Sequence, residues 1–399
     1  MKKILIFETF PVSPHFETSI EIALKNIKEG NKVYFFWGGY NLPWSDWKLP
    51  NYKKLLFFSY KYKVDKATEY LKKNSVIIVD KINFDKKISN YIERLSKKIT
   101  FKNLKNIKYK NCSMGLAVYS SLLSKYHSNN SKVFKNNFKS AFRSGCIVYE
   151  RANKVINQVK PNIIYTFNSR FVISRPILEV AKRKKIKVYR HERGSSLDKY
   201  EIFKNDIFDE KYIYNLINNH WKKEKNEKKK KRIALNYLKY IETNKYYKKL
   251  GFNYDSFNQN ILNLDHKKKN ILFICTTDYE HQAISLDYKR FYINKEWSKQ
   301  INAIKSLIDL IKKKKNFFLI IKAHPNFKQD KKLEEKFNSL QAENVIYLSA
   351  SSKINTYDLI KKSNIICSFG SSLELFSSFY KKKTISFFKT LWLKFNIVD

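Results

Sequence analysis

Two short segments in the second half of this 399-residue chain contain residues that can hold an anion. Gly370-Ser371-Ser372 follows an apolar segment at residues 364–368 and precedes a segment with helical spacing. Glycine lets the backbone approach a ligand closely, and serine hydroxyls together with the free N–H groups at a helix start can hold phosphate. His324 stands before Pro325 on a rigid turn, where its imidazole can donate a hydrogen bond to a diphosphate.

Each of these residues also has an ordinary structural interpretation. Ser371 or Ser372 can cap a helix, and His324 can be a loop histidine. Glu374 lies in the expected helix, where its carboxylate can accept from ribose hydroxyls or complement the helix dipole. Because the segments occur together, we favour a diphosphate site that uses His324, Ser371 and Ser372, with Gly370 and Glu374 on the nucleoside side.

Polar residues also follow three other apolar segments that we interpret as strands. The additional clusters are Asp278 and Glu280 after residues 270–275, Asn168 and Arg170 after residues 162–167, and Glu192 and Arg193 after residues 187–190. Ligands of parallel α/β sheets bind beyond the carboxyl ends of the strands, so polar clusters at five such ends favour a functional site. Asp278 and Glu280 have the spacing of a metal-binding DxD motif, but they stand at the start of the second domain and we expect no metal there.

The elements that must position these clusters alternate along the chain. Apolar strands that alternate with amphipathic helices predict parallel sheets covered on both faces. In the second half we expect strands at 270–275, 317–321, 345–348, 364–368 and 384–388, with helices between them. In the first half we expect strands at 3–7, 32–37, 54–59, 76–79, 162–167 and 187–190, helices at 16–29 and 174–185, and a mostly helical region at 84–160.

These patterns divide the chain into three parts. We expect Rossmann-like domains at residues 1–204 and 267–399, separated by a helical, lysine-rich linker region at residues 205–266. The run at residues 222–232 within that region is most simply a solvated helix face.

The net charge of +45 has two interpretations. A nucleic-acid reader would favour arginine, whose planar fork matches phosphates and guanine edges, but only 10 of the 80 basic residues are arginine. The lysines are dispersed along the chain, as biased coding would produce. We therefore expect no specific nucleic-acid partner, whereas loose contact with an anionic membrane is compatible with lysines.

Other motifs and the cysteines narrow the class further. The sequence has no GxGxxG segment after its first strand, no Walker A loop, no HExxH and no GxSxG, so dinucleotide oxidoreductases and P-loop kinases are poorly supported. Cys112, Cys146, Cys275 and Cys367 form no CxxC pair, and we expect buried free thiols in a reducing cytoplasm. The N-terminal apolar run is too short for a signal peptide, and we expect no membrane span.

A resemblance to a known family rests on the motifs above. A strand followed by His-Pro, and a later strand followed by Gly-Ser-Ser-x-Glu, resemble the donor domain of the bacterial capsular polysaccharide biosynthesis and lipopolysaccharide glycosyltransferase group. This group includes Kdo transferases and is distantly similar to sialyltransferases and teichoic-acid glycerophosphotransferases. Further similar elements are Thr276-Thr277-Asp278-Tyr279-Glu280, Tyr357-Asp358-Leu359-Ile360, Phe167-Asn168-Ser169-Arg170 and His191-Glu192-Arg193-Gly194.

The resemblance implies a GT-B-like fold, in which two Rossmann-like domains face a cleft. It implies a cytoplasmic transferase, at the inner face of the membrane, that moves a sugar from a CMP- or UDP-sugar to a surface polysaccharide or lipid-linked acceptor. No metal or other cofactor is required, because protein donors neutralise the leaving phosphate. The first domain would take the acceptor and the second the nucleotide sugar. Glu8, Glu192 and Asp278 are the candidates for the base, and the choice among them stays open.

Several alternatives remain beside this hypothesis. A glycerophosphotransferase would use the same diphosphate chemistry, a UDP-sugar epimerase shares the architecture, and a non-catalytic scaffold of the glycan assembly machinery belongs to another class. The chain also departs from the group's pattern, because it ends at Asp399, where the group usually continues with helices. We therefore expect a second domain that is truncated or naturally short.

Overall fold

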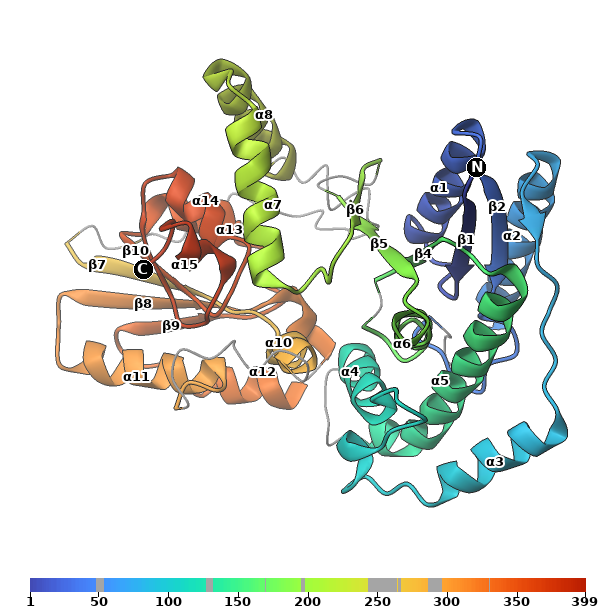
Figure 1. Ribbon diagram of the computed structural model, residues 1–399. Coiled ribbons are helices and arrows are strands. Elements are labelled where there is room, and N and C mark those ends of the chain that lie inside the picture. Colours follow the sequence, from blue (N-terminus) through green and yellow to red (C-terminus); the bar gives the residue numbers. More distant parts are fainter. Residues whose placement is uncertain are drawn as a thin grey trace. The chain divides into compact units, whose positions relative to one another are not determined.

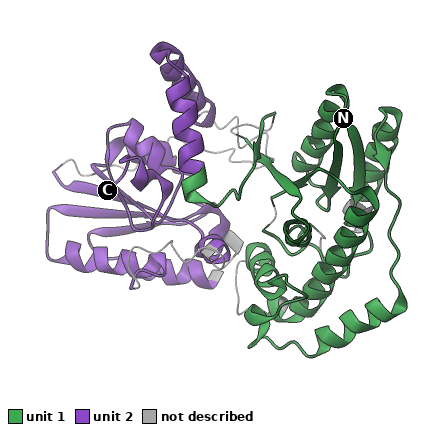
Figure 2. Cartoon of the chain, in the orientation of Figure 1, with its two compact units in different colours: residues 1–212 green, residues 213–399 purple. Residues whose placement is uncertain are grey.

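The computed structural model describes residues 1–47, 54–126, 132–168, 170–194, 198–242, 264, 267–285, 296–329 and 331–399. The chain divides into two compact units, residues 1–212 and residues 213–399, which are described separately below (Figure 2). Helices α7 (Glu210–Lys223) and α8 (Glu227–Glu242) lie within the expected linker region, and much of its remainder lies outside the described residues.

Unit 1 is built on a six-stranded sheet with the order β3-β2-β1-β4-β5-β6. The strands are β1 (Lys3–Glu8), β2 (Lys32–Trp37), β3 (Ile77–Ile78), β4 (Ile163–Phe167), β5 (Lys187–Arg193) and β6 (Tyr200–Phe203). The first five are parallel, and β6 runs antiparallel to β5. The strand order reverses between β1 and β4, and such a switch point opens a crevice at the carboxyl edge of a sheet.

Helices cover both faces of this sheet. The helices of unit 1 are α1 (His15–Lys28), α2 (Lys54–Lys73), α3 (Lys86–Lys97), α4 (Met114–Tyr126), α5 (Lys132–Val159) and α6 (Arg175–Arg183), with a short 3₁₀ turn, η2, at Leu104–Asn106. Of these, α3 and α4 pack on α5. Ile4 and Ile6 of β1 pack in one cluster with residues of α1 and α2. Helix α5, which contributes none of its described residues to this cluster, also contacts β1, and Figure 1 shows the arrangement of these elements. Adjacent residues of a strand point to opposite faces, which explains why the whole of β1 after Lys3 is buried.

The strand expected at residues 54–59 is wrong, because these residues open helix α2. Val64, Ala67 and Leu71 of this helix are buried at helical spacing against β1 and β2. A short apolar run cannot by itself distinguish a strand from the start of a long helix, and here the later periodicity decides. The strand at 76–79 is present as the two-residue β3, and β6 was not expected.

Unit 2 is built on a five-stranded, entirely parallel sheet with the order β11-β10-β7-β8-β9. The strands are β7 (Lys269–Ile274), β8 (Phe317–Lys322), β9 (Val345–Leu348), β10 (Ile365–Ser368) and β11 (Lys383–Ser386). All five coincide with expected strands. This sheet and that of unit 1 confirm the expected fold class, α/β with two Rossmann-like domains.

Side chains of β7 alternate between two cores in unit 2. Ile271 and Phe273 pack with α11 (Gln300–Lys312) and α12 (Lys331–Asn338). Leu272 and Ile274 pack with α13 (Thr356–Lys362), α14 (Glu374–Phe379) and α8. The remaining elements are α10 (Asp278–Ser285), η3 (Pro325–Gln329) and α15 (Leu391–Lys394).

Helix α4 holds the chain segment that follows β4. The hydroxyl of Ser121 accepts from the N–H of Val172 at 2.8 Å, and Arg170 donates to Ser120 Oγ at 2.8 Å. The position of α4 depends in turn on Gly115, because a Cβ at this residue would lie 1.7 Å from the carbonyl oxygen of Leu104 in η2.

We expect Gly115→Ala to lower the free energy of unfolding by about 1–3 kcal/mol, because the added methyl group would collide with the backbone of Leu104, which must then move. Chemical denaturation followed by circular dichroism measures this change. Asn136→Ala on the exposed face of α5 is the control, with an expected change within about 0.5 kcal/mol. Equal stability of the two variants would contradict the close packing of α4 on η2.

Candidate functional site

The predicted anion-binding segments lie at one edge of the unit 2 sheet. Strand β7 pairs in parallel with β8 on one side and β10 on the other. His324 follows β8, and Gly370-Ser371-Ser372 follows β10. Neighbouring strands are about 4.8 Å apart, so the ends of β8 and β10 are separated by about 10 Å. The structure thus brings these two segments to a common carboxyl edge, on either side of the segment that follows β7.

The imidazole of His324 is oriented by its own loop. Its Nδ1 accepts from the N–H of Asn326 at 3.1 Å, which leaves the ring proton on Nε2. The side chain of Asn326 donates to the hydroxyl of Tyr279 at 3.0 Å, so the loop is also tied to α10. His324 is partly exposed. This tautomer is the one that can donate to a phosphate through Nε2.

The turn after β10 differs in part from the expected helix start. Gly370 has φ of +78°, a conformation that favours glycine. Ser371 is largely buried, and its hydroxyl accepts from the N–H of Leu373 at 3.2 Å. Ser372 is exposed. Because α14 begins only at Glu374 and is six residues long, its dipole adds little, and the turn itself must supply the donors.

The predicted contact between Glu374 and a ribose does not fit this structure. The carboxylate is fully buried, Oε1 accepts from the hydroxyls of Ser368 and Ser386, and Oε2 accepts from Thr390. Burial raises the pKa of Glu374. The residue therefore holds together the segments that follow β10 and β11, a role that its position in sequence did not reveal.

His281 is a component of this edge that the sequence analysis missed. Its Nε2 lies 3.2 Å from the hydroxyl of Thr276, which itself donates to the carbonyl of Phe369. The ring packs on Phe388 at a centroid distance of 4.1 Å, and a Cβ at Gly370 would lie 3.0 Å from it. Burial lowers the pKa of His281 to about 4, so the ring is neutral at pH 7. The residue directly follows Glu280, which the sequence analysis had singled out.

The two carboxylates at the start of α10 have local partners. Asp278 accepts from the N–H of Gln300 at 3.2 Å, and burial raises the pKa of Asp278 to about 6. Glu280 is exposed and accepts from the hydroxyl of Thr277 at 2.8 Å. Across the described residues, no group of three or more His, Cys, Asp or Glu side chains has the arrangement of a metal site.

A second polar cluster lies at the carboxyl edge of unit 1, where Glu8 ends β1. Glu8 is fully buried, and Oε1 accepts from the N–H groups of Thr9 at 2.7 Å and Phe10 at 2.8 Å. Oε2 accepts from the hydroxyl of Ser19 at 2.6 Å, and Ser19 Oγ in turn lies 2.8 Å from His191 Nε2. A carboxylate so enclosed holds the turn after β1, so its predicted role as a base does not fit this structure.

Glu192 is the more accessible carboxylate of this edge, with its side chain 28% exposed. Its Oε2 accepts from Asn168 Nδ2 at 2.8 Å, and its Oε1 lies 3.7 Å from His15 Nδ1. The ring of His15 packs on Phe167 at 4.1 Å, and burial lowers the pKa of His15 to about 4. The charge of the nearby Arg193 also lowers this pKa.

Four residues of unit 1 were missed by the sequence analysis or are placed differently from its expectation. His15 and Ser19 come from α1, which faces the end of β1 only once the chain has folded. Arg170, expected at the ligand site, uses Nη1 to bind Ser120 and Ser124 of α4. Asn168 instead approaches Glu192, from a backbone conformation with φ of +53°.

Two further expectations concern the cysteines and membrane-spanning helices. All four cysteines are buried and free, as expected. In the part of the chain that the structure describes, no helix combines the length and apolarity that a membrane crossing requires.

No protein-family model matches the sequence, and no curated protein matches it. Comparison with solved structures gives weak similarities to GT-B proteins. The UDP-GlcNAc 2-epimerase from Neisseria meningitidis bound to UDP-GlcNAc is 14% identical, with 97% of this chain and 82% of that chain covered and a TM-score of 0.30. The corresponding epimerase from Methanocaldococcus jannaschii is 13% identical, with 97% and 83% covered and a TM-score of 0.32. The β-Kdo 2,7 transferase KpsC from Thermosulfurimonas dismutans is 10% identical, with 62% and 72% covered and a TM-score of 0.35. The fold assignment rests on the sheet topology described above.

We expect the stability of the protein to fall on acidification in part because of His281. Its pKa is about 4 in the folded state against 6.5 in the unfolded chain, so its contribution is complete above pH 6.5 and is lost as the pH falls toward 4. His281→Phe, which keeps a ring against Phe388, should reduce the slope of unfolding free energy against pH in this window by up to about 1.4 kcal/mol per pH unit. Urea unfolding at several pH values measures the slope.

The control for this experiment is His220→Phe, which changes an exposed histidine of α7. Its slope should equal that of the unaltered protein. An unchanged slope in His281→Phe would show that His281 is not held neutral in the fold.

Proposed function

We propose that the protein is a glycosyltransferase that moves a sugar from a CMP- or UDP-sugar to a hydroxyl group of a surface polysaccharide or lipid-linked acceptor. The observation that carries this proposal is the common edge of unit 2, to which His324 brings a ring N–H and Gly370-Ser371-Ser372 brings a glycine turn with an exposed hydroxyl. In the reaction, the bond between the anomeric carbon and the donor phosphate breaks, and a bond to the acceptor oxygen forms. The proton of the acceptor hydroxyl passes to a base.

Unit 2 would hold the donor. His324 Nε2, the Ser372 hydroxyl and the backbone of the Gly370 turn would donate to the phosphate, whose negative charge increases as the sugar leaves. Ser371 would support the turn, because its side chain is largely buried and its hydroxyl accepts from the N–H of Leu373. With these donors the reaction would need no divalent metal, and activity in the presence of EDTA tests this part of the proposal.

Unit 1 would supply the base, and Glu192 is the candidate that the geometry favours. Its carboxylate is partly exposed and is oriented by Asn168, whereas that of Glu8 is enclosed by its own donors. Asp278 has a pKa raised to about 6, which suits a base, but its carboxylate is occupied by Gln300. We therefore assign proton removal to Glu192 and positioning of the segment after β7 to Asp278.

A lipid-linked acceptor would bring the protein to the cytoplasmic face of the membrane. Lys228, Lys229 and Lys231 of α8 are exposed, and lysines near a surface attract anionic lipids by about 1 kcal/mol each. This contact would be peripheral and would weaken with salt.

We expect His324→Ala to weaken binding of the donor nucleotide ten- to a hundredfold, because a hydrogen bond to a charged group contributes about 1.5–3 kcal/mol. Thermal-shift screening against CMP, UDP, GDP and CDP first identifies the nucleotide, and calorimetric titration then gives Kd. Ser372→Ala should act in the same direction. The double variant should lose less than the sum of the single losses, because both residues act on one group.

His220→Ala is the control for a lost histidine in unit 2. If His324→Ala binds the nucleotide with the same Kd as this control, His324 does not contribute to a phosphate site. If none of the four nucleotides raises the melting temperature, the proposed function is contradicted and the non-catalytic alternative is favoured.

We expect Glu192→Gln to lower kcat by about 10²–10⁴-fold with little change in the KM of the donor, since an amide keeps the shape but cannot take a proton. The measurement is initial rates over a range of donor and acceptor concentrations, which separates kcat from KM. Glu201→Gln, on the strand position paired with Glu192, is the control and should retain full activity. A kcat within threefold of normal in Glu192→Gln would exclude it as the base.

A further inference from the structure

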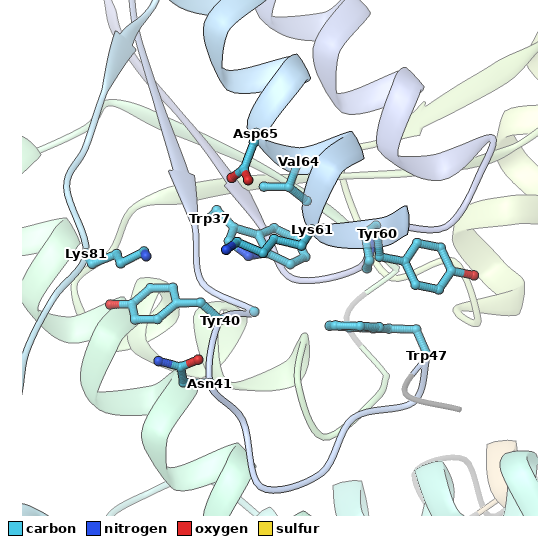
Figure 3. A pocket seen from close by; sticks show the side chains of 11 residues that line it. Trp37, Tyr40, Asn41, Trp47, Tyr60, Lys61, Val64, Asp65 and Lys81 are labelled. Carbon is cyan, nitrogen blue, oxygen red and sulfur yellow. The ribbon is translucent and has the colours of Figure 1, made fainter. Parts of the chain in front are cut away.

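Unit 1 contains a cavity of about 120 Å³ that lies apart from the cluster around Glu192 in sequence and in lining residues. It opens at the carboxyl end of β2, and its walls come from β2, the following loop, α2 and the segment after β3 (Figure 3). Pro11, in the loop after β1, also lines it. Neither the phosphate site nor the proposed base uses this cavity.

Aromatic rings form much of the cavity wall. The ring centroids of Trp37 and Trp47 are 6.3 Å apart, and those of Trp47 and Tyr60 are 5.6 Å apart with the planes at 72°. The indole N–H of Trp47 donates to the carbonyl of Thr9 at 2.9 Å, in the same turn that Glu8 organises. Rings oriented at these angles present both edges and faces to a ligand.

Tyr40 completes the aromatic wall and is held from behind. The guanidinium of Arg151 stacks on its ring at 3.6 Å, and Nη1 donates to the carbonyls of Gly38 at 2.8 Å and Tyr40 at 2.6 Å. Arg151 is buried, so this support comes from inside unit 1. The wall is therefore formed before any ligand binds, which reduces the entropy lost on binding.

The rim of the cavity is polar. Asn41, Lys61, Asp65 and Lys81 are exposed and line it (Figure 3). Pockets that combine a fixed apolar wall with a few polar groups bind small molecules with a preferred orientation. A pyranose ring is complementary to such a pocket, because its faces carry C–H groups that can pack on the aromatic wall and its edge carries hydroxyl groups that can reach the polar rim. The two ammonium groups against one carboxylate favour a ring that carries a negative charge.

We propose that this cavity binds one pyranose ring of a glycan, and that it favours a ring bearing a carboxylate. The ring packs against the indole of Trp47 and the ring of Tyr60, while Lys61 and Lys81 bind the carboxylate. That this glycan is the acceptor rests on the proposed function, but the binding of sugar by unit 1 does not.

Saturation-transfer NMR on the full-length protein tests this inference with two probes, a hyaluronan tetrasaccharide, in which uronic acids alternate with neutral rings, and the neutral maltotetraose. We expect transfer to ring protons of the acidic probe and weaker transfer to the neutral one. Trp47→Ala and Tyr60→Ala should each lower the signal at least fivefold, and Lys81→Glu should lower it for the acidic probe alone. Trp221→Ala, which removes an exposed tryptophan of α7, is the matched control and should leave it unchanged.

Tyr60→Ala keeps the test informative if Trp47→Ala does not fold, because Tyr60 is only partly buried on α2. Signals that persist in both variants, or a preference for the neutral probe, would overturn the inference. So would a signal that depends on Trp47 but comes from CMP or UMP, since an aromatic wall can also stack a nucleobase. Nucleotide titration of the same samples separates the two proposals, because sugar binding without nucleotide binding supports the cavity and rejects the transferase.

Discussion

A buried carboxylate must be surrounded by hydrogen-bond donors, and in each unit a fully buried glutamate lies at the edge of the sheet where the candidate site lies. Glu8 in unit 1 accepts from two backbone N–H groups and a serine hydroxyl. Glu374 in unit 2 accepts from three hydroxyl groups, those of Ser368 at the end of β10, Ser386 at the end of β11 and Thr390 after β11. Removing donors from a buried charge costs several kcal/mol, so these carboxylates fix the loops around them.

The accessible groups of each edge stand next to these fixed points. The turn that Glu8 holds also receives the indole N–H of Trp47, so the aromatic cavity and the start of α1 share one anchor. In unit 2, Ser368 connects Glu374 to the N–H of Ser371, which precedes the exposed Ser372. A site residue that must stay in contact with solvent cannot be fixed by its own burial. Ser372 is instead positioned by the largely buried Ser371 that precedes it.

The sequence predicted the strands of unit 2 and the edge at which His324 and Ser372 lie, because apolar periodicity and the direction of parallel strands determine both. It did not reveal the partners of Glu8 and Glu374, since these come from Ser19 on a helix and from Ser386 and Thr390 at and after the end of β11. For the same reason His15 and His281 were missed. Their neighbours are set by packing, for which a single sequence carries no periodic signal.

The buried histidines of the two sheet edges, His15 in unit 1 and His281 in unit 2, also limit how each edge can interact with a charged ligand. His15 and His281 have pKa values lowered to about 4 by burial, so both are neutral at physiological pH. A neutral imidazole donates one hydrogen bond and accepts another, but it brings no positive charge to a phosphate. In the proposed reaction, charge on the leaving group would be met by oriented N–H and O–H dipoles of the unit 2 edge, with His281 packed behind the Gly370 turn. Such dipoles would stabilise a transition state only when they are fixed in advance, and the hydrogen bonds among the groups of this edge would fix them.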